Sequence, residues 1–598
     1  MIIIIIIVQI IDGGSTGSRL HIFEFVHDSW TNRTNCIRRG SEKVQIPLSA
    51  YAPSSLLLSL DEEQDEPNEI EPSSRPLSNA KEDDGSVRAL NATHVAQHLI
   101  PLFEYAAQIV PSKYYSTTHV MLQATAGMRL LPEQEQELVY DAIYMGLKEH
   151  PNFVFAHMQR ADIGALPGSV EALYGAVAAN FLKGVVDVHL HMLPPNHNDD
   201  DNHNATSPVG YTDSNLDSKD DNDDSDNLNV QMEQDNDFDG PLGALDMGGA
   251  SMQIVYLPNT DENPECHNDH HDTCNDHQSM DLLPDISHPN RLNSDEFFSV
   301  SYLSYGADQF RERLYDTFVN ERDRLQANEA SHSSSNAILN PCSFEGYVFD
   351  WKGYEFVGTG DAKQCAMEVN RLIPHHEEPV DHDYYDDNYY YDYNDEEEDF
   401  IGGVLVHNNA MTKRRKVGGV HHPPVRGKFF AMSLFFFTLD CLRELSGHAA
   451  LNASWPTPSI GELTDALDIL CSRKWHGDLE HIQHNSHEFT RAEVLPDRCF
   501  EAVYMVTLLR DGFGFEWDSR DITFTYLVDG SEVEWSLGMA ISHFAEEETP
   551  AVTVLQSDCS SDCSSKSKLK GLWSHGRRSA PFQYMSTSIK RILGFSLQ

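Results

Sequence analysis

Positive charge is scarce in this chain, and that scarcity limits the partners it can have. Its 598 residues include 94 Asp and Glu but only 42 Lys and Arg, which gives a formal net charge of -52. A protein of this sign repels the phosphates of DNA, RNA and anionic membranes, so the usual electrostatic gain of binding is missing. We therefore expect no nucleic-acid partner.

Two further features are missing. No apolar stretch reaches the roughly 20 residues of a membrane-spanning helix, so we expect the chain as given to be soluble. None of the 10 cysteines belongs to the paired CxxC pattern typical of a zinc site. Cysteines together with glycosylation acceptor patterns favour an oxidising compartment, either the secretory pathway (Golgi or ER lumen) or the cell exterior. The acceptor patterns begin at Asn32, Asn91, Asn204 and Asn452.

The N-terminus is apolar but does not have the form of a signal peptide. Residues 1–11 lack a basic start and a small-residue cleavage site, and they run directly into a glycine-rich stretch. Cleavage here would remove the strand that supports this stretch. We interpret residues 1–11 as the first strand and expect any leader or membrane anchor to lie upstream of Met1.

Three segments, 196–239, 259–293 and 375–426, are predicted to be disordered insertions, acidic on the whole. The first consists mostly of Asp, Asn, Ser and His. Such a composition buries too little apolar surface to offset the entropy of ordering. The rest of the chain is too long for one core and suits two lobes.

Two short stretches far apart in the chain have nearly the same composition. Residues 12–19 read DGGSTGSR and residues 245–253 read LDMGGASMQ, each with an acid, adjacent glycines and a hydroxyl. Apolar runs on both sides predict that each lies on a strand-to-strand turn. Glycines let backbone amides approach an anion, and a hydroxyl adds a donor. Two such loops predict a site that binds a polyphosphate from both sides.

Two further patterns lie between these loops. Residues 120–130 predict a strand that ends in the motif ATAGMR, followed by a helix from about Pro132. Farther on, Glu171 stands at the start of a predicted helix through Leu182, where the helix dipole favours a carboxylate. From position alone, Glu171 fits either a helix-end charge or a catalytic acid.

Five motifs follow one another along the chain: residues 12–19, 124–129, 168–180, 245–253, and 499–515 with 535–538. Their order resembles the apyrase conserved regions of the GDA1/CD39 nucleoside triphosphate diphosphohydrolases. The resemblance implies an α/β fold of the actin, Hsp70 and sugar-kinase (ribonuclease H-like) type, with two related lobes that close on a nucleotide. Lobe I then comprises residues 1–168 and 536–598, and lobe II residues 169–535.

The same resemblance implies hydrolysis of the terminal phosphate of nucleoside tri- or diphosphates. Glu171 matches the base that activates the attacking water, and Ser251 and Gln253 match the residues that fix that water. Asp12 and Asp246 match acids that hold Ca²⁺ or Mg²⁺, largely through water. Phosphate-binding positions are Gly13, Gly14, Ser15, Thr16, Gly17, Ser18, Thr125, Gly248, Gly249 and Ala250. Arg19 and Arg129 either touch the ligand or hold the loops.

More distant matches concern the base and the cysteines. The apolar run 429–438 resembles a segment whose aromatic residue stacks on the nucleobase, which makes Phe436 or Phe437 the candidate, although such a run also suits a core. The resemblance also implies disulfides Cys342–Cys365 and Cys471–Cys499. Buried reduced cysteines are the alternative.

The chain departs from the family pattern beside the presumed base. Val170 stands where a second acid is usual, and Ala172 where a glycine is usual. Two other functions remain open: an exopolyphosphatase on the same fold, and a nucleotide-gated binding module without turnover. The intact set of Glu171, Ser251 and Gln253 favours hydrolysis over mere binding, because a binding module needs no residues that position water.

Overall fold

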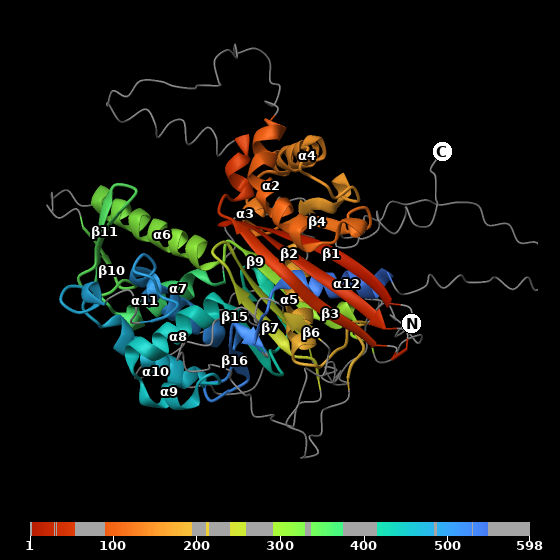
Figure 1. The fold of residues 1–598 in the computed structure, drawn as a ribbon. Coiled ribbons are helices and arrows are strands. Elements are labelled where there is room, and N and C mark those ends of the chain that lie inside the picture. The colour runs from red at the N-terminus through yellow and green to blue at the C-terminus, as the bar shows by residue number, and fades with distance from the viewer. Residues whose placement is uncertain are drawn as a thin grey trace, which may run out of the picture. The chain divides into compact units, whose positions relative to one another are not determined.

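Two β-sheets that share one arrangement form the framework of the structure, which is a computed structural model (Figure 1). The described residues up to Ala545 belong to one compact unit. The structure describes residues 3–28, 30–31, 33–53, 90–193, 211–213, 240–258, 291–328, 337–374, 416–482, 487–528 and 530–547.

The first sheet has six strands in the order β5 (Ile163–Ala165), β4 (His119–Ala124), β1 (Ile3–Gly14), β2 (Gly17–Asp28), β3 (Arg33–Val44) and β6 (Tyr211–Asp213). β1 and β2 form an antiparallel hairpin, and β4 runs parallel to β1 on its other side. The turn of the hairpin leaves Ser15 and Thr16 between Gly14 and Gly17. Gly17 has a φ of 148°, and a Cβ there would lie 2.2 Å from the Val44 carbonyl oxygen. Only glycine fits this position.

The second sheet has five strands in the order β16 (Ile522–Phe524), β15 (Phe429–Ser433), β7 (Gly243–Met247), β8 (Ser251–Tyr256) and β9 (Phe298–Leu303). Here β7 and β8 form the antiparallel hairpin, and β15 runs parallel to β7. The pattern of a hairpin beside a parallel strand is thus the same as in the first sheet. It places the two glycine-rich loops at equivalent turns.

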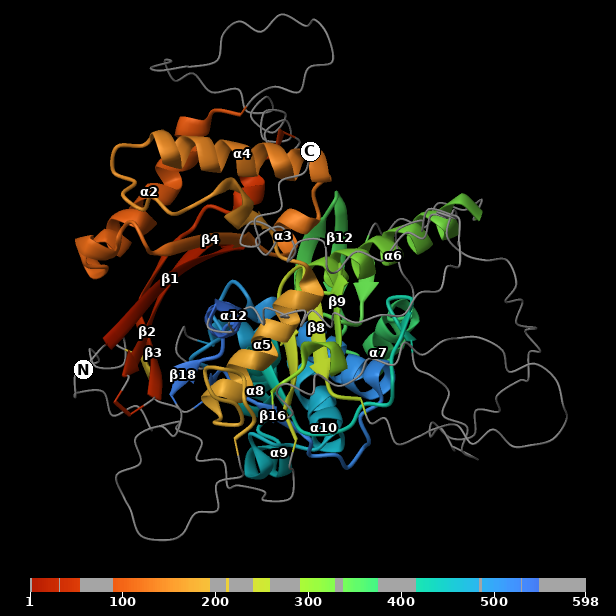
Figure 2. The ribbon, with the colours of Figure 1, turned by 90° about the vertical axis from the view of Figure 1, so that its right-hand side faces the viewer.

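Two helices, α5 (Gly168–Leu182) and α12 (Trp535–Glu547), pack with both sheets (Figure 2). One apolar core joins Phe25 of β2 and Phe430 of β15 to side chains of these helices, such as Phe181 and Phe544. The helices approach each other closely, because a Cβ at Gly538 would lie 1.8 Å from the carbonyl oxygen of Tyr174. The parts of the chain that carry the two loops are therefore held by one pair of helices.

Separate cores fill the outer side of each sheet. The first sheet is covered by α2 (Ala92–Ile109) and α4 (Glu133–Glu149), whose apolar residues surround Phe103 and Tyr140. A larger core beside the second sheet includes both implied disulfides, Cys342–Cys365 and Cys471–Cys499, which the structure forms. Its helices are α6 (Ala307–Asn328), α7 (Ala362–Leu372), α8 (Leu434–Ser446), α9 (Ala449–Ser454), α10 (Ile460–Cys471) and α11 (Arg498–Thr507).

The remaining described strands and the shortest α-helix lie outside the two main sheets. They are α3 (Ala126–Arg129), β10 (Ile338–Asn340), β11 (Val348–Trp351), β12 (Tyr354–Gly358), β13 (Lys416–Val417), β14 (Val420–His421), β17 (Leu527–Val528) and β18 (Ser531–Glu532).

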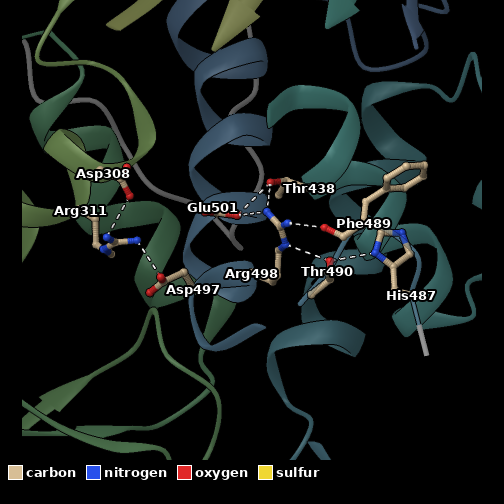
Figure 3. A network of polar contacts seen from close by, with 9 residues as sticks. All are labelled: Asp308, Arg311, Thr438, His487, Phe489, Thr490, Asp497, Arg498 and Glu501. Atoms are coloured by element: carbon tan, nitrogen blue, oxygen red, sulfur yellow. Dashed lines mark hydrogen bonds and ion pairs between the residues drawn. The ribbon is translucent and has the colours of Figure 1, made fainter. Parts of the chain in front are cut away.

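A buried polar network ties α11 to its neighbours (Figure 3). The Arg498 guanidinium pairs with Glu501 and donates to the hydroxyls of Thr438 and Thr490. Each charge therefore has partners that offset the cost of its burial. A second pair of contacts, from Arg311 to Asp308 and Asp497, links the start of α6 to the segment before α11.

The predicted insertions lie mainly outside the described residues, with two differences. Within 196–239, β6 pairs parallel with β3. The third insertion ends earlier than we expected, because residues 416–426 include the β13–β14 hairpin and the fully buried Val417. At the turn of that hairpin, Gly418 packs against Tyr302 and Tyr305, so this segment contributes to the core. Of the second insertion, only residues 291–293 are described.

Candidate active site

One pocket of about 250 Å³ lies where the two glycine-rich loops meet α5 and the start of α12. It is lined by Asp12, Ser15, Thr125, Ala126, Glu171, Asp246, Gly248, Gly249, Ala250, Ser251, Gln253, Ser433, Val533, Glu534, Trp535 and Ser536. Residues from six separate parts of the sequence therefore share one wall. Every catalytic or metal-holding residue expected from the sequence is among them.

The first loop contributes fewer residues to the pocket than we expected. Asp12, Ser15 and Thr125 line it, and the Thr125 amide donates to the carbonyl of Gly13 at 3.1 Å. A Cβ at Gly13 would lie 2.7 Å from Leu48 Cδ1, so this glycine allows close packing behind the loop. The expected phosphate contacts that do not line the pocket are Gly13, Gly14, Thr16, Gly17 and Ser18.

The second loop is held from behind by the start of α6. The amides of Ala307 and Asp308 donate to the carbonyls of Gly248 and Gly249 at 2.9 and 3.0 Å. A Cβ at Gly249 would lie 2.4 Å from a carboxylate oxygen of Asp308, so any side chain there would require the Asp308 carboxylate to move. The loop is therefore fixed before any ligand arrives, and it presents Gly248, Gly249 and Ala250 to the pocket.

Glu171, Ser251 and Gln253 meet around Arg129. Ser251 and Gln253 lie two residues apart on β8 and so point to the same face, where the Gln253 Nε2 donates to Ser251 Oγ at 2.9 Å. Arg129 Nη1 donates to Glu171 Oε2 at 2.7 Å and to the Leu166 carbonyl at 2.7 Å, and its Nη2 donates to Ser251 Oγ at 3.4 Å. Burial raises the pKa of Glu171, while the charge of Arg129 opposes that rise.

Asp12 and Asp246 are partly buried acids near corresponding ends of β1 and β7. Burial, followed by the charges of Glu171 and Glu534, raises the pKa of Asp12 to about 8. Burial also raises the pKa of Asp246, against the effects of the Ser433 side chain and the Met247 backbone. In both acids burial outweighs the groups that lower the pKa, which for Asp12 include Arg19.

This pair of acids fits a hard divalent cation. Each has an Oδ1 oxygen that is buried with no hydrogen-bond partner in the structure, and such an oxygen is costly unless something binds it. Among the described residues, no three or more His, Cys, Asp and Glu side chains are arranged to hold a metal. Two carboxylates suit a cation that keeps much of its water, as Mg²⁺ does.

Six pocket residues had no assigned role in our sequence interpretation, and they are Ala126, Ser433, Val533, Glu534, Trp535 and Ser536. Ser433 ends β15 with a φ of 54°, unusual for a residue other than glycine, and its side chain opposes the raised pKa of Asp246. Trp535 belongs to a recognised motif, and its side chain opposes the raised pKa of Asp12. Glu534 carries no sequence signal of its own beyond the position next to Trp535.

The two phenylalanines proposed for the nucleobase lie outside the pocket wall. Phe436 is only 6% exposed and packs in an aromatic cluster with Phe437, Trp455, Phe489 and Tyr526. Phe436 is thus a core residue, while Phe437, Phe489 and Tyr526 are partly exposed. An aromatic surface is present here, but Phe436 contributes little to its exposed part.

Comparison with solved structures identifies the fold. A nucleoside triphosphate hydrolase structure from Neospora caninum matches with a TM-score of 0.50 and 13% identity, over 92% of this chain and 93% of that one. With the duplicated hairpins, this likeness confirms the expected α/β fold of two related, actin-like halves. None of the described helices has the length and apolar character needed to cross a bilayer.

Sequence comparison gives the family. The chain is 22% identical to a Golgi apyrase of Saccharomyces cerevisiae, over 88% of this chain and 69% of that protein. It is 23% identical to ectonucleoside triphosphate diphosphohydrolase 7 of Mus musculus, over 76% of this chain and 63% of that protein. The model of one family matches residues 86–383 and 405–561, which include Glu171 and the second loop but not the first. The chain therefore belongs to the GDA1/CD39 (nucleoside phosphatase) family.

Proposed function

We propose that the protein hydrolyses the terminal phosphate of nucleoside tri- or diphosphates by direct attack of a water that Glu171 activates, with a divalent cation bound. The observation that carries this proposal is the shared pocket, where Glu171, Ser251 and Gln253 face both glycine-rich loops. Hydrolysis of a phosphoanhydride needs a positioned water, a group that accepts its proton, and donors for the phosphate oxygens. The pocket supplies all three.

Ser251 is arranged to position the water. Its Oγ accepts hydrogen bonds from Gln253 and Arg129, so both acceptor directions of the hydroxyl are occupied. The hydroxyl hydrogen is then free to donate to an oxygen in the pocket. A water held by this donation and by the carbonyl oxygen of the Gln253 side chain directs its proton to the carboxylate of Glu171.

Arg129 holds the base in place and favours its ionised form. Its guanidinium bonds Glu171, Ser251 and the Leu166 carbonyl at once. The counter-charge opposes the effect of burial on the pKa of Glu171, so the carboxylate is available to accept a proton. Of the two roles open for Arg129 from the sequence, the network favours holding protein groups.

Asp12 and Asp246 would hold the cation, Ca²⁺ or Mg²⁺, largely through its waters. When bound, such a cation neutralises charge on the phosphate oxygens. The amides and hydroxyls of both loops orient the phosphates, with Ser15 and Thr125 on one side and Gly248, Gly249 and Ala250 on the other. For the base, we propose the exposed part of the aromatic cluster, with Phe437 as the stacking residue.

The names of the relatives extend the proposal to a compartment. A Golgi apyrase and an ectonucleoside triphosphate diphosphohydrolase are among the proteins that this chain resembles. We propose that the protein works in the secretory pathway or at the cell surface. The disulfides Cys342–Cys365 and Cys471–Cys499 support an oxidising compartment.

Phosphate release tests the function. Purified protein is assayed with ATP, ADP, UDP, GDP and polyphosphate, with Mg²⁺ or Ca²⁺ and then with EDTA. Glu171→Gln keeps the size of the side chain but removes the base, and we expect a loss of roughly 10² to 10⁴ in kcat. Glu149→Gln, at the exposed end of α4, is the matched control and should retain full activity.

Each outcome separates the candidate functions. Release from nucleotides that EDTA and Glu171→Gln abolish supports the proposal. Release from polyphosphate alone identifies an exopolyphosphatase. Nucleotide binding with no more phosphate than the Glu171→Gln background identifies a binding module and overturns the proposal.

A further inference from the structure

Glu534 lines the pocket, but both of its carboxylate oxygens already contact protein groups. Its Oε1 accepts from Arg19 Nη1 at 2.7 Å, while its Oε2 lies 3.0 Å from His21 Nδ1 and 3.3 Å from Arg38 Nη2. The three partners come from β2 and β3 of the first sheet. One carboxylate therefore joins that sheet to the residue before α12.

The contact is mostly shielded from water. The side chains of His21 and Arg38 are 2% and 6% exposed, and that of Glu534 is 18% exposed. Burial alone would raise the pKa of Glu534, but His21, Arg38 and Arg19 outweigh it and hold this pKa well below its usual range. Glu534 thus stays ionised and paired, so its charge serves this contact and is not available to a ligand.

Glu532, two residues before Glu534, is an incidental acid, by which we mean one that makes only long, exposed contacts with the same arginines. It lies 3.8 Å from both Arg19 and Arg38, and its side chain is 50% exposed. Exposed pairs of this kind contribute little. Glu532 and Glu534 lie two residues apart on the same short segment, but only Glu534 makes close contacts with the first sheet.

The next residue connects this contact to the site. Trp535 begins α12 and lines the same pocket as Asp12, and its side chain opposes the raised pKa of that acid. Asp12 is itself the cross-strand partner of Arg19 in the β1–β2 hairpin. Arg19 therefore contacts Glu534 on one side and stands opposite Asp12 on the other, so a shift of the Glu534 contact moves the indole relative to Asp12.

The other end of the same turn is fixed against α5. Gly538 packs on the backbone of Tyr174, one helical turn after Glu171. The first turn of α12 is therefore held on both sides, by the contact of Glu534 with the first sheet and by the contact of Gly538 with α5. If the Glu534 contact is lost, the Gly538 contact is the one of these two that remains.

We propose that Glu534 is a positioning residue that holds Trp535 against Asp12 and thereby sets the affinity of the pocket for its divalent cation. The inference rests on the proposed function, since it concerns the cation that Asp12 and Asp246 would hold. Residues that orient such a site from outside typically change metal affinity by about 10- to 100-fold when they are replaced.

The test measures cation binding without turnover. Thermal unfolding is followed at increasing Mg²⁺ with no nucleotide, which gives the concentration that produces half of the full stabilisation. We expect Glu534→Gln to raise this concentration by about tenfold. The control Glu532→Gln, which removes the incidental acid, should change it by about twofold or less.

A second set of variants, made in protein that carries Trp535→Phe, distinguishes a positioning role of Glu534 from a general loss of structure around the pocket. If Glu534 acts through the indole, Glu534→Gln should have no further effect on cation affinity in protein that already carries Trp535→Phe, because coupled residues are not additive. Arg38→Gln removes one of the three partners of Glu534 and should give a smaller shift that vanishes in the same background. This milder variant keeps the test valid if Glu534→Gln does not fold.

Two results would overturn the inference. One is an unchanged cation affinity in Glu534→Gln and Arg38→Gln. The other is a loss of equal size in the Trp535→Phe background, which would show that Glu534 acts independently of the indole. A protein that binds Mg²⁺ in the expected pattern but releases no phosphate would contradict the proposed function and leave this inference intact.

Discussion

Arg129 Nη1 lies 2.7 Å from Oε2 of Glu171, so the base of the proposed reaction is paired with a cation in the resting site. The two residues come from different strand-to-helix junctions, after β4 and at the start of α5. A paired base is weaker than a free one but is ionised at lower pH. Arg129 therefore opposes the effect of burial on the pKa of Glu171 and, in the proposed reaction, would extend the proton acceptor to lower pH.

Removal of this partner should shift the pH dependence of activity. In Arg129→Gln the pKa of Glu171 rises further above its ordinary value, so the acid limb of kcat/KM should move to higher pH by about one unit or more. The profile is measured from pH 4 to 9. Arg160→Gln, which breaks exposed pairs with Glu137 and Asp141, is the control. An acid limb that stays in place in Arg129→Gln would show that Glu171 does not set it.

Ser433 offers a test that separates backbone strain from side-chain chemistry. Its φ of 54° suits glycine better than any residue with a Cβ. Ser433→Gly and Ser433→Ala both remove the hydroxyl that opposes the raised pKa of Asp246, so both should weaken cation binding. Ser433→Gly should nevertheless be more stable than Ser433→Ala by about 1 kcal/mol, because it adopts this φ without strain. Thermal unfolding of the two variants without cation checks this, and equal stabilities would contradict it.

Gly538→Ala should disturb both stability and activity. The added Cβ would lie 1.8 Å from the Tyr174 carbonyl oxygen, so α12 must move away from α5. Overpacking of this kind costs about 1 to 3 kcal/mol or more. Because α12 carries Trp535 and α5 carries Glu171, phosphate release should fall even below the unfolding temperature. Gly353→Ala is a control for a glycine with open space around it, although its φ of 82° adds some strain; full activity in Gly538→Ala would contradict the prediction.

Glu462 gives a prediction for stability at acid pH. It completes the capping box of α10 with Ser459, and Arg520 bonds both of its carboxylate oxygens. The hydrogen bonds from Arg520 lower the pKa of Glu462 from 4.5 to about 2. A lowered pKa means that the contribution is present above pH 4.5 and is lost as pH falls through about 2. Glu462→Gln should therefore cost about 1 kcal/mol at neutral pH and progressively less below pH 4.5, measured by urea unfolding. A cost that is independent of pH would contradict this account.

The sequence predicted the structure best where an apolar strand pattern lies beside residues suited to binding phosphate. Apolar runs beside the two glycine-rich stretches predicted strands, and the structure has β1, β2, β7 and β8 there. The residues expected to do chemistry, including Glu171 and Asp246, line one pocket. These positions were predictable because a loop that binds phosphate must combine small residues with donors in a short span.

Other features depend on contacts that no local pattern records. β3 has the mixed sequence RTNCIRRGSEKV and forms a strand because β2 provides a paired edge. Arg19 and Glu534 meet although 515 residues separate them. The aromatic run 429–438 could not be divided by sequence alone, and burial shows Phe436 to be core. Long-range pairing and burial decide these cases, so sequence reasoning could not.

The shared packing of α5 and α12 with both sheets also bears on how a substrate enters. Gly538 has no side chain to separate the backbones of α12 and α5 at Tyr174, so we expect the two helices to move together when a substrate enters. Glu171 lies on α5 and Trp535 on α12. A motion that keeps this contact would therefore leave the spacing between Glu171 and Trp535 unchanged.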